Sequence, residues 1–342
     1  MKIAIMTAWN TEDGAAIHSK ALVTQWQKMD HKVTVFSFIK KKDSSERFTD
    51  EDGREVIRCF DNGYIDPIPI LNTEHDVFVV ENLRMLPVNE LSKIFPLISS
   101  RSRTVHIVHE QSLPEKTWFY QLLWDKVIYY DANQEFFKNI YRDAEYVPFP
   151  CFPLRKGNKQ KYRTRLDLPQ EKKIIFVFCQ RGYEPYITSL PESIKDKAIL
   201  LFVTPKGSAI TSKLEGKKNI IIREEDTLTI SKFDEYLFAS DAVVLHKMKS
   251  RYHNIMSALI FQLIGAGCPI FIPQISEFFR QLKDEIINYA DIEDLNNKIC
   301  ELFEHEQPEM LERAEVFVRM NGAEKIAQLY IDLFTNILRK RC

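Results

Sequence analysis

Short apolar runs alternate with helical patterns along the first half of the chain. One helical pattern, Ala15–Met29, carries apolar residues at helical spacing, and Asp52-Gly53 predicts a hairpin turn. Several of the apolar runs are apolar on both faces, which is typical of a parallel sheet covered by helices on both sides. The runs that predict strands are Ile3–Met6, Lys32–Phe38, Asp76–Val80, Thr104–His109 and Val127–Tyr130.

The second half repeats this alternation, which predicts right-handed crossovers and doubly wound sheets. We therefore expect an α/β protein with two Rossmann-like, doubly wound parallel-sheet domains that face a central cleft. The predicted strands are Lys173–Phe178, Ile199–Val203, Asn219–Ile222, Ala242–Leu245, Pro269–Ile272 and Ile286–Tyr289. The predicted helices are Ser231–Ala239, Asn254–Ile264, Ile292–Glu304 and Glu324–Leu338.

Three prolines between 148 and 153, followed by the basic segment 155–165, indicate a boundary between the two halves. We expect an N-terminal domain over 1–150, a linker over 151–168, a second domain over 169–322 and a C-terminal helix over 323–342. The helix has a broad apolar face, so we expect it to pack back across the domains. The basic segment and the basic C-terminus leave contact with an anionic membrane surface as the alternative.

Composition excludes several classes of protein. The 342 residues are 45% hydrophobic and 28% charged with a net charge of −1, which excludes a disordered chain and gives no sign of nucleic-acid binding. Six scattered cysteines indicate a reducing compartment rather than a zinc ribbon. The uncharged stretch 252–276 contains glycines and prolines, so a helix, a turn and a strand explain it better than a membrane span. We expect a cytoplasmic protein, with attachment to the inner face of the membrane as the alternative.

Ligands of open α/β sheets bind outside the carboxyl ends of the strands. After the first strand, Asn10, Gly14 and Ala15 lie in a turn that leads into a helix, where backbone amides favour an anion. The turn lacks the glycine patterns of dinucleotide-binding proteins and P-loop proteins. His109 and Glu110 follow the fourth strand, and this histidine is suited to contact a substrate hydroxyl or phosphate. The plainer interpretations are that the glycine only eases a turn and that the histidine is an ordinary polar residue whose hydrogen bonds are satisfied within the fold.

Basic residues stand at three strand ends of the second half. Arg181, Lys206 and Lys247 follow the predicted strands there. Exposed Lys and Arg are common, so each of them alone predicts little. Together they indicate a diphosphate site, because arginine and lysine both bind phosphate oxygens.

Four stretches resemble GT-B glycosyltransferases, most closely the family 4 type. The most specific stretch ends in Gly265-Ala266-Gly267-Cys268-Pro269, similar to that family's helix stop before Gly-x-Pro. The four stretches are Met1–Phe36, Val105–Glu110, Phe176–Gly182 and Phe233–Ile272. Many relatives carry two glutamates in the helix before Gly-x-Pro, and this chain has Asn254 and Gln262 at those positions. Some relatives lack the pair and have Ser-Gly instead, which Ser257-Ala258 partly matches.

The resemblance implies a role for each candidate residue. It places Arg181, Lys206 and Lys247 near the donor diphosphate, Ser257 near the donor and Gln262 near the ribose. His109 and Asn254 would act at the reacting sugar. The turn with Asn10, Gly14 and Ala15, together with Glu110, would contact the acceptor or a phosphate.

The function implied by the resemblance is transfer of a hexose from a nucleotide-sugar to a hydroxyl acceptor on a sugar, a glycan or a lipid-linked molecule. The reaction is expected to be retaining. No Asp-x-Asp motif stands at a strand end, so we expect neither a metal nor a cofactor. Because amides replace the paired glutamates, a non-catalytic GT-B protein that binds a nucleotide or partners an active transferase is the alternative. A sugar-nucleotide epimerase on the same fold is a third possibility.

Overall fold

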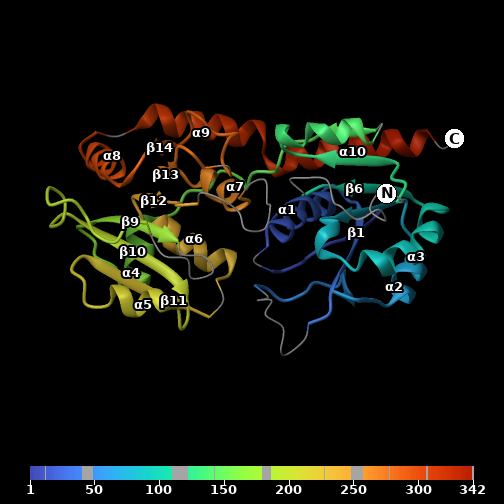
Figure 1. The fold of residues 1–342 in the computed structure, drawn as a ribbon, viewed down its shortest axis with the longest axis horizontal. Coiled ribbons are helices and arrows are strands. Elements are labelled where there is room, and N and C mark those ends of the chain that lie inside the picture. The colour runs from blue at the N-terminus through green and yellow to red at the C-terminus, as the bar shows by residue number, and fades with distance from the viewer. Residues whose placement is uncertain are drawn as a thin grey trace. The chain divides into compact units, whose positions relative to one another are not determined.

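The chain forms two compact units in the computed structural model (Figure 1). Unit 1 comprises Met1–Cys151, Ser250–Leu259 and Asn321–Cys342, and unit 2 comprises Phe152–Lys249 and Ile260–Met320, as far as these segments are described. The structure describes residues 1–11, 13–40, 49–109, 122–141, 143–178, 186–226, 228–247, 257–276, 278–305 and 307–340.

Unit 1 is built on an eight-stranded sheet in the order β4-β3-β2-β1-β5-β6-β7-β8. All neighbouring strands pair in parallel except β3 and β4. Its central strand β5 is buried at every position, as a sheet covered on both faces requires. The strands are β1 (Lys2–Met6), β2 (Lys32–Phe38), β3 (Val56–Asp61), β4 (Tyr64–Ile65), β5 (Val77–Glu81), β6 (Arg103–Ile107), β7 (Lys126–Tyr129) and β8 (Ala144–Tyr146).

The C-terminal helix α10 packs against α1 within unit 1. Trp26 of α1 is fully buried, and its indole N–H donates to the carbonyl of Ala327, 3.3 Å away. In the described part of the chain, no helix combines the length and the apolar character needed to cross a bilayer. The helices of this unit are α1 (Gly14–Lys28), α2 (Pro67–Asn72), α3 (Val88–Ser99) and α10 (Ala323–Arg339), with the 3-10 helices η1 (Leu83–Met85) and η3 (Ala132–Asn139).

The hairpin predicted at Asp52-Gly53 is wrong. Strand β3, which follows that turn, pairs in parallel with β2, so the two cannot form a hairpin. The antiparallel pair is β3 with β4, joined through residues 62 and 63. Asn62-Gly63 is itself a dipeptide favoured in hairpin turns, whereas the Asp52 carboxylate is engaged in an ion pair with Arg58.

Unit 2 carries a six-stranded parallel sheet in the order β11-β10-β9-β12-β13-β14. Gly267 ends the helical segment before β13 with φ of 67°, a left-handed conformation that favours glycine. The strands are β9 (Lys173–Phe178), β10 (Ala198–Pro205), β11 (Ile220–Glu225), β12 (Ala242–Val244), β13 (Ile270–Pro273) and β14 (Ile287–Tyr289). The helices are α4 (Lys159–Arg165), α5 (Ala209–Leu214), α6 (Ile230–Ala239), α7 (Leu259–Leu263), α8 (Ile292–Glu304) and α9 (Pro308–Met320), with η5 (Ile264–Ala266).

Residues 152–168, which the sequence presents as a linker, belong to unit 2 and include α4. Arg163 of this helix is buried, and its guanidinium donates to the carbonyls of Ala239, Gln170 and Lys172 and pairs with Asp241. The helix is therefore tied to α6 and to the start of β9 by buried polar contacts.

Each sheet has a point at which the strand order reverses. It lies between β1 and β5 in unit 1 and between β9 and β12 in unit 2. The expected fold class of two Rossmann-like parallel sheets is confirmed by this topology. The carboxyl ends of the strands that flank each reversal are the places where such sheets bind ligands.

Candidate functional site

Buried polar side chains gather at the reversal point of the unit 1 sheet. Thr7 directly follows β1, and Glu81 is the last residue of β5; both are fully buried. The Thr7 hydroxyl donates to Oε2 of Glu81 over 3.3 Å. Because β1 and β5 are parallel neighbours, residues that end these two strands meet at one edge of the sheet.

A chain of hydrogen bonds runs from Glu81 across the next two strands. Nε2 of His109 donates to Oε1 of Glu81 over 2.7 Å. On the other side of the ring, Nδ1 lies 2.6 Å from the hydroxyl of Tyr130, which follows β7. If Nε2 carries the proton, the phenol donates to Nδ1. Both ring nitrogens of His109 are thus engaged by protein groups.

A second imidazole approaches the same carboxylate from α1. Nδ1 of His18 lies 2.7 Å from Oε1 of Glu81 as an ion-pair contact, and among the described residues neither ring nitrogen of His18 has a hydrogen-bond partner. The ring is fully buried, with its centroid 4.8 Å from that of Phe149 and 6.2 Å from that of Tyr330. We refer to Thr7, His18, Glu81, His109 and Tyr130 as the switch-point cluster.

The cluster places a negative charge in the interior of unit 1. Burial alone would raise the pKa of Glu81, but the His18 and His109 imidazoles beside it lower this pKa to about 2. Burial lowers the pKa of His18 despite the neighbouring carboxylate. The structure therefore presents an ionised carboxylate next to a neutral imidazole.

Two kinds of chemistry are open to this arrangement. The linked carboxylate, imidazole and phenol can hold and orient a proton at the sheet edge. The same carboxylate and the two imidazoles offer three potential metal-ligand atoms within 4.8 Å of one another.

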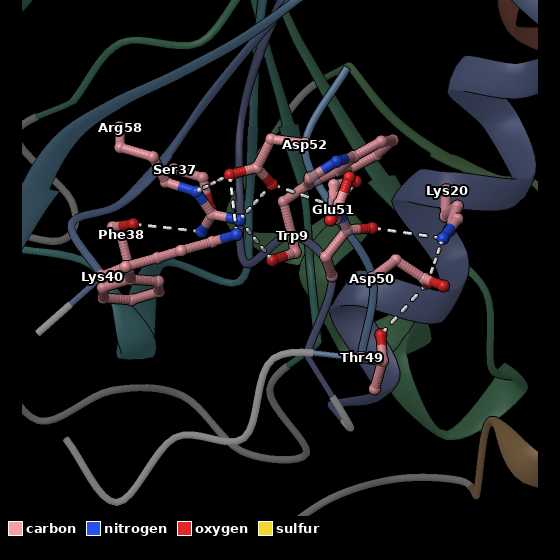
Figure 2. A network of polar contacts seen from close by, with 11 residues as sticks. Trp9, Lys20, Ser37, Phe38, Lys40, Thr49, Asp50, Glu51, Asp52 and Arg58 are labelled. Carbon is pink, nitrogen blue, oxygen red and sulfur yellow. Dashed lines mark hydrogen bonds and ion pairs between the residues drawn. The ribbon is translucent and has the colours of Figure 1, made fainter. Parts of the chain in front are cut away.

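The turn after β1 is held by a polar network (Figure 2). Asn10 takes part in this network. Asn10 has φ of 53°, and its side-chain amide donates to the carbonyl of Glu51 and to Asp52. Its amide oxygen accepts from Lys20 of α1 over 3.1 Å. In unit 1 the Asn10 side chain therefore shapes the turn. Of the other residues predicted for this turn, Gly14 is the first residue of α1, and Ala15 is the second and is buried.

Arg58 of β3 is the centre of this network (Figure 2). Its guanidinium donates to both carboxylate oxygens of Asp52, over 3.1 and 2.7 Å, and to the carbonyls of Trp9 and Phe38. Burial would raise the pKa of Asp52, but hydrogen bonds from Arg58, Lys40 and Asn10 lower it to about 2. The turn after β1 is thus fixed by a residue two strands away.

The candidates of unit 2 differ in their surroundings. Lys206 follows β10, and its exposed ammonium lies 3.6 Å from Asp226. Lys247 follows β12 and is half-buried, with its ammonium 5.2 Å from the centre of the Phe278 ring. Gln262 is buried in α7. Ser257, two residues before α7, falls in unit 1 and is buried as well.

An aromatic stack that the sequence did not predict stands at the carboxyl end of the unit 2 sheet. The rings of Tyr186 and His246 are parallel, with centroids 3.8 Å apart. Nδ1 of His246 lies 2.7 Å from the hydroxyl of Tyr289, the last residue of β14. Burial lowers the pKa of His246.

Three predicted site residues, Arg181, Asn254 and Glu110, lie outside the described residues. Of the switch-point cluster, His109 alone was singled out from the sequence. Two signals point to the missed residues. Glu81 is a carboxylate that closes the otherwise apolar strand Val77–Val80, and His18 lies on the buried face of α1 with Ala15 and Leu22.

Comparisons with known proteins were made by sequence and by structure. No model of a known protein family matches the chain. The fold is similar to HepE of Anabaena, solved in complex with UDP-glucose, with a TM-score of 0.68 and 12% identity over 98% of this chain and 100% of that chain. It is similar to a glycosyltransferase of Rickettsia africae, with a TM-score of 0.69 and 12% identity over 98% of both chains. It is also similar to WaaG, a glycosyltransferase involved in lipopolysaccharide biosynthesis, with a TM-score of 0.59 and 14% identity over 97% of this chain and 99% of that chain.

These similarities extend over nearly the whole chain and therefore over both units. The GT-B fold expected from the sequence resemblance is thereby confirmed. Assignment to family 4 stays a prediction.

Proposed function

We propose that this protein is a glycosyltransferase that moves a hexose from a nucleotide-sugar to a hydroxyl acceptor. One observation carries the proposal: both units match, over 98% of the chain, a structure solved with UDP-glucose bound. A similar match is to an α-glucosyltransferase solved in complex with UDP, at a TM-score of 0.62.

In this proposal unit 2 holds the donor. Lys206 follows β10 and Lys247 follows β12, the two strands on either side of β9, at the carboxyl edge of one parallel sheet where the charge of a diphosphate would be placed. Lys247 is half-buried, so its ammonium is less screened by water than that of Lys206. We assign Lys247 the larger share of phosphate binding and propose that Arg181 and Ser257 add to it. No metal bridges the diphosphate in this proposal, because basic side chains supply the positive charge.

We propose a retaining reaction in which amides replace the paired acids of many GT-B enzymes. Gln262 would donate and accept hydrogen bonds at the ribose. Asn254 would do the same at the donor sugar, but an amide supplies no charge to a cationic transition state. The charge that stabilises this transition state would then come from the donor's own diphosphate.

The acceptor would approach the carboxyl edge of the unit 1 sheet. The switch-point cluster lies at this edge, and the side chain of His109, which follows β6, is 9% exposed whereas that of Glu81 is fully buried. Because both His109 ring nitrogens are engaged, we propose that this residue acts as the middle of the Glu81–His109–Tyr130 chain. The acceptor is a sugar, a glycan or a lipid-linked hydroxyl; the last would suit peripheral contact with a membrane.

The second candidate function is a non-catalytic protein that binds a nucleotide or partners an active transferase. The observation in its favour is the pair of amides at 254 and 262. It predicts nucleotide binding without turnover, whereas the first proposal predicts slow donor hydrolysis by the purified protein even without an acceptor.

The first test is thermal unfolding with UDP, GDP, ADP, CMP and their sugar conjugates, each with and without magnesium. A ligand at 100 times its dissociation constant stabilises by about 2.7 kcal/mol, which raises the midpoint by several degrees in units of this size. A shift with one base supports donor binding, and release of free sugar from that donor separates the enzyme from the non-catalytic protein. No shift with any nucleotide would contradict the transferase and favour the non-catalytic partner of an active transferase.

A further inference from the structure

His18, Glu81 and His109 together offer a set of metal ligands, a role that the proposed transfer reaction does not give them. Their side chains come from α1, from the end of β5 and from the segment after β6, so sequence spacing does not reveal them. The three potential ligand atoms lie within 4.8 Å of one another. We propose that these residues bind a divalent transition-metal ion, with zinc as the best match.

The chemistry of the donors fits zinc. Two imidazole nitrogens and one carboxylate oxygen are the three protein ligands of a common class of zinc site. Both nitrogens lie 2.7 Å from Oε1 of Glu81. Two ligands at about 2.0 to 2.1 Å from one ion are separated by roughly 2.6 to 3.4 Å when they subtend about 80 to 110 degrees at it. The observed separations lie at the short end of that range.

The surrounding residues resemble the outer shell of a metal site. A metal-bound histidine usually donates its other ring N–H to an oxygen. With Nε2 on the ion, Nδ1 of His109 would carry the proton and donate to the Tyr130 hydroxyl, which is 2.6 Å away. The second carboxylate oxygen of Glu81 accepts from Thr7. Each of these two ligands is thus oriented through its remaining polar atom.

His18 supplies the independent observation. Its ring is fully buried, and in the part of the chain that the structure describes neither nitrogen has a hydrogen-bond partner, although Nδ1 lies beside Oε1 of Glu81. Leaving a buried polar group unsatisfied carries a cost in stability. An ion bound to Nδ1 would remove that cost for one nitrogen. It would also compensate the negative charge of the buried carboxylate.

The proposal is independent of the transferase activity, and its test measures metal rather than turnover. Purified chain, freed of metal with a chelator, is titrated with Zn²⁺ in equilibrium dialysis and with Co²⁺ in the visible absorption spectrum. The variants are His18→Asn, Glu81→Gln and His109→Gln. The matched control is His75→Gln, because His75 is also a buried histidine of unit 1 but lies outside the cluster.

We expect the wild-type chain and the control to bind one zinc ion per chain, and each ligand variant to lose more than about 100-fold in affinity. Wild-type binding that equals that of the ligand variants would overturn the proposal, since surface histidines would then account for it.

Thermal unfolding keeps the proposal testable if a variant is unstable. We expect Zn²⁺ to raise the wild-type midpoint and chelator to reverse the rise. Any ligand variant that folds should show no such rise. If the wild-type midpoint does not respond to Zn²⁺ and no Co²⁺ spectrum develops, the three side chains form a hydrogen-bonded cluster only and the proposal is wrong.

Discussion

Nε2 of His109 lies 2.7 Å from Oε1 of Glu81, so a histidine at one strand end is held by a carboxylate that closes the neighbouring strand. The contact joins residues 28 positions apart, and the carboxylate is fully buried. Since a buried charge is stable only with its partners, this pair ties the fold of unit 1 to the arrangement of its candidate site.

Replacing Glu81 tests that dependence. We expect Glu81→Ala to reduce the free energy of unfolding by about 3 to 5 kcal/mol, because His109 and Thr7 lose their acceptor in the interior. Glu81→Gln keeps an acceptor and should cost about 1 to 3 kcal/mol. Urea unfolding in the presence of chelator measures both without a contribution from metal. Glu74→Ala, at an exposed site before the same strand, is the control and should leave stability unchanged. Equal stability of wild type and Glu81→Ala would contradict the prediction.

The Arg58 network predicts a local effect on the turn after β1. Arg58→Lys loses the bidentate contact with Asp52 and the hydrogen bonds to the carbonyls of Trp9 and Phe38. We expect a loss of about 1 to 3 kcal/mol and faster amide hydrogen exchange at Thr7–Asn10 and at 49–52. Lys40→Ala removes the more exposed partner of Asp52 and should have a smaller effect. Unchanged exchange in Arg58→Lys would show that the turn is held by other contacts.

His75 predicts a pH dependence of stability. Burial, with a contribution from the charge of Arg101, lowers the pKa of His75 to about 4 in the folded chain, against an ordinary histidine value of 6.5. Between these values the unfolded chain binds a proton that the folded chain does not, so the stabilisation is complete above pH 6.5 and is lost as the pH falls toward 4. The loss is on the order of 3 kcal/mol.

The measurement is urea unfolding of wild type and His75→Gln across that pH window. Other buried histidines add a slope of the same sign, so the difference between the two proteins is the relevant quantity. We expect the variant to lose less stability on acidification. Parallel curves for the two proteins would mean that His75 does not contribute.

The buried contacts of Arg163 predict that α4 contributes to the stability of unit 2. Its guanidinium side chain is 6% exposed, and its removal leaves Asp241 and three carbonyls without that donor. We expect Arg163→Ala to destabilise unit 2 by about 3 to 5 kcal/mol, measured by chemical unfolding. Arg313→Ala removes an exposed i,i+4 pair with Glu309 and serves as the control with little effect. If Arg163→Ala behaved like the control, residues 152–168 would be a solvated connector.

The proposed role of Lys247 in phosphate binding predicts an effect on nucleotide affinity. We expect Lys247→Ala to weaken binding of the stabilising nucleotide diphosphate by about tenfold to a hundredfold, which corresponds to one lost charge-assisted contact. Titration calorimetry with that nucleotide measures the effect. Lys195 lies just before the amino end of β10, in the same unit but at the opposite edge of the sheet, so Lys195→Ala should bind normally. Equal affinity of Lys247→Ala and wild type would place the diphosphate elsewhere.

The sequence by itself determined the fold class and most strands. Runs such as 32–38 and 173–178 coincide with observed strands because a strand buried on both faces has to be apolar at nearly every position. The position of His109 after a strand was likewise evident, since strand ends follow from the same pattern. The turn at 52–53 was misassigned because turn-forming residues indicate a change of direction but not the strand that pairs next.

Only the tertiary structure decided which of these strand ends meet. Glu81, His18 and His109 are far apart along the chain, and they become neighbours because β5 lies between β1 and β6 and because α1 packs beside that edge. Strand order depends on how whole elements pack and cross over, not on any local pattern. The buried carboxylate between two imidazoles, and the assignment of Arg58 to a turn two strands away, therefore appear only when the sheet is assembled.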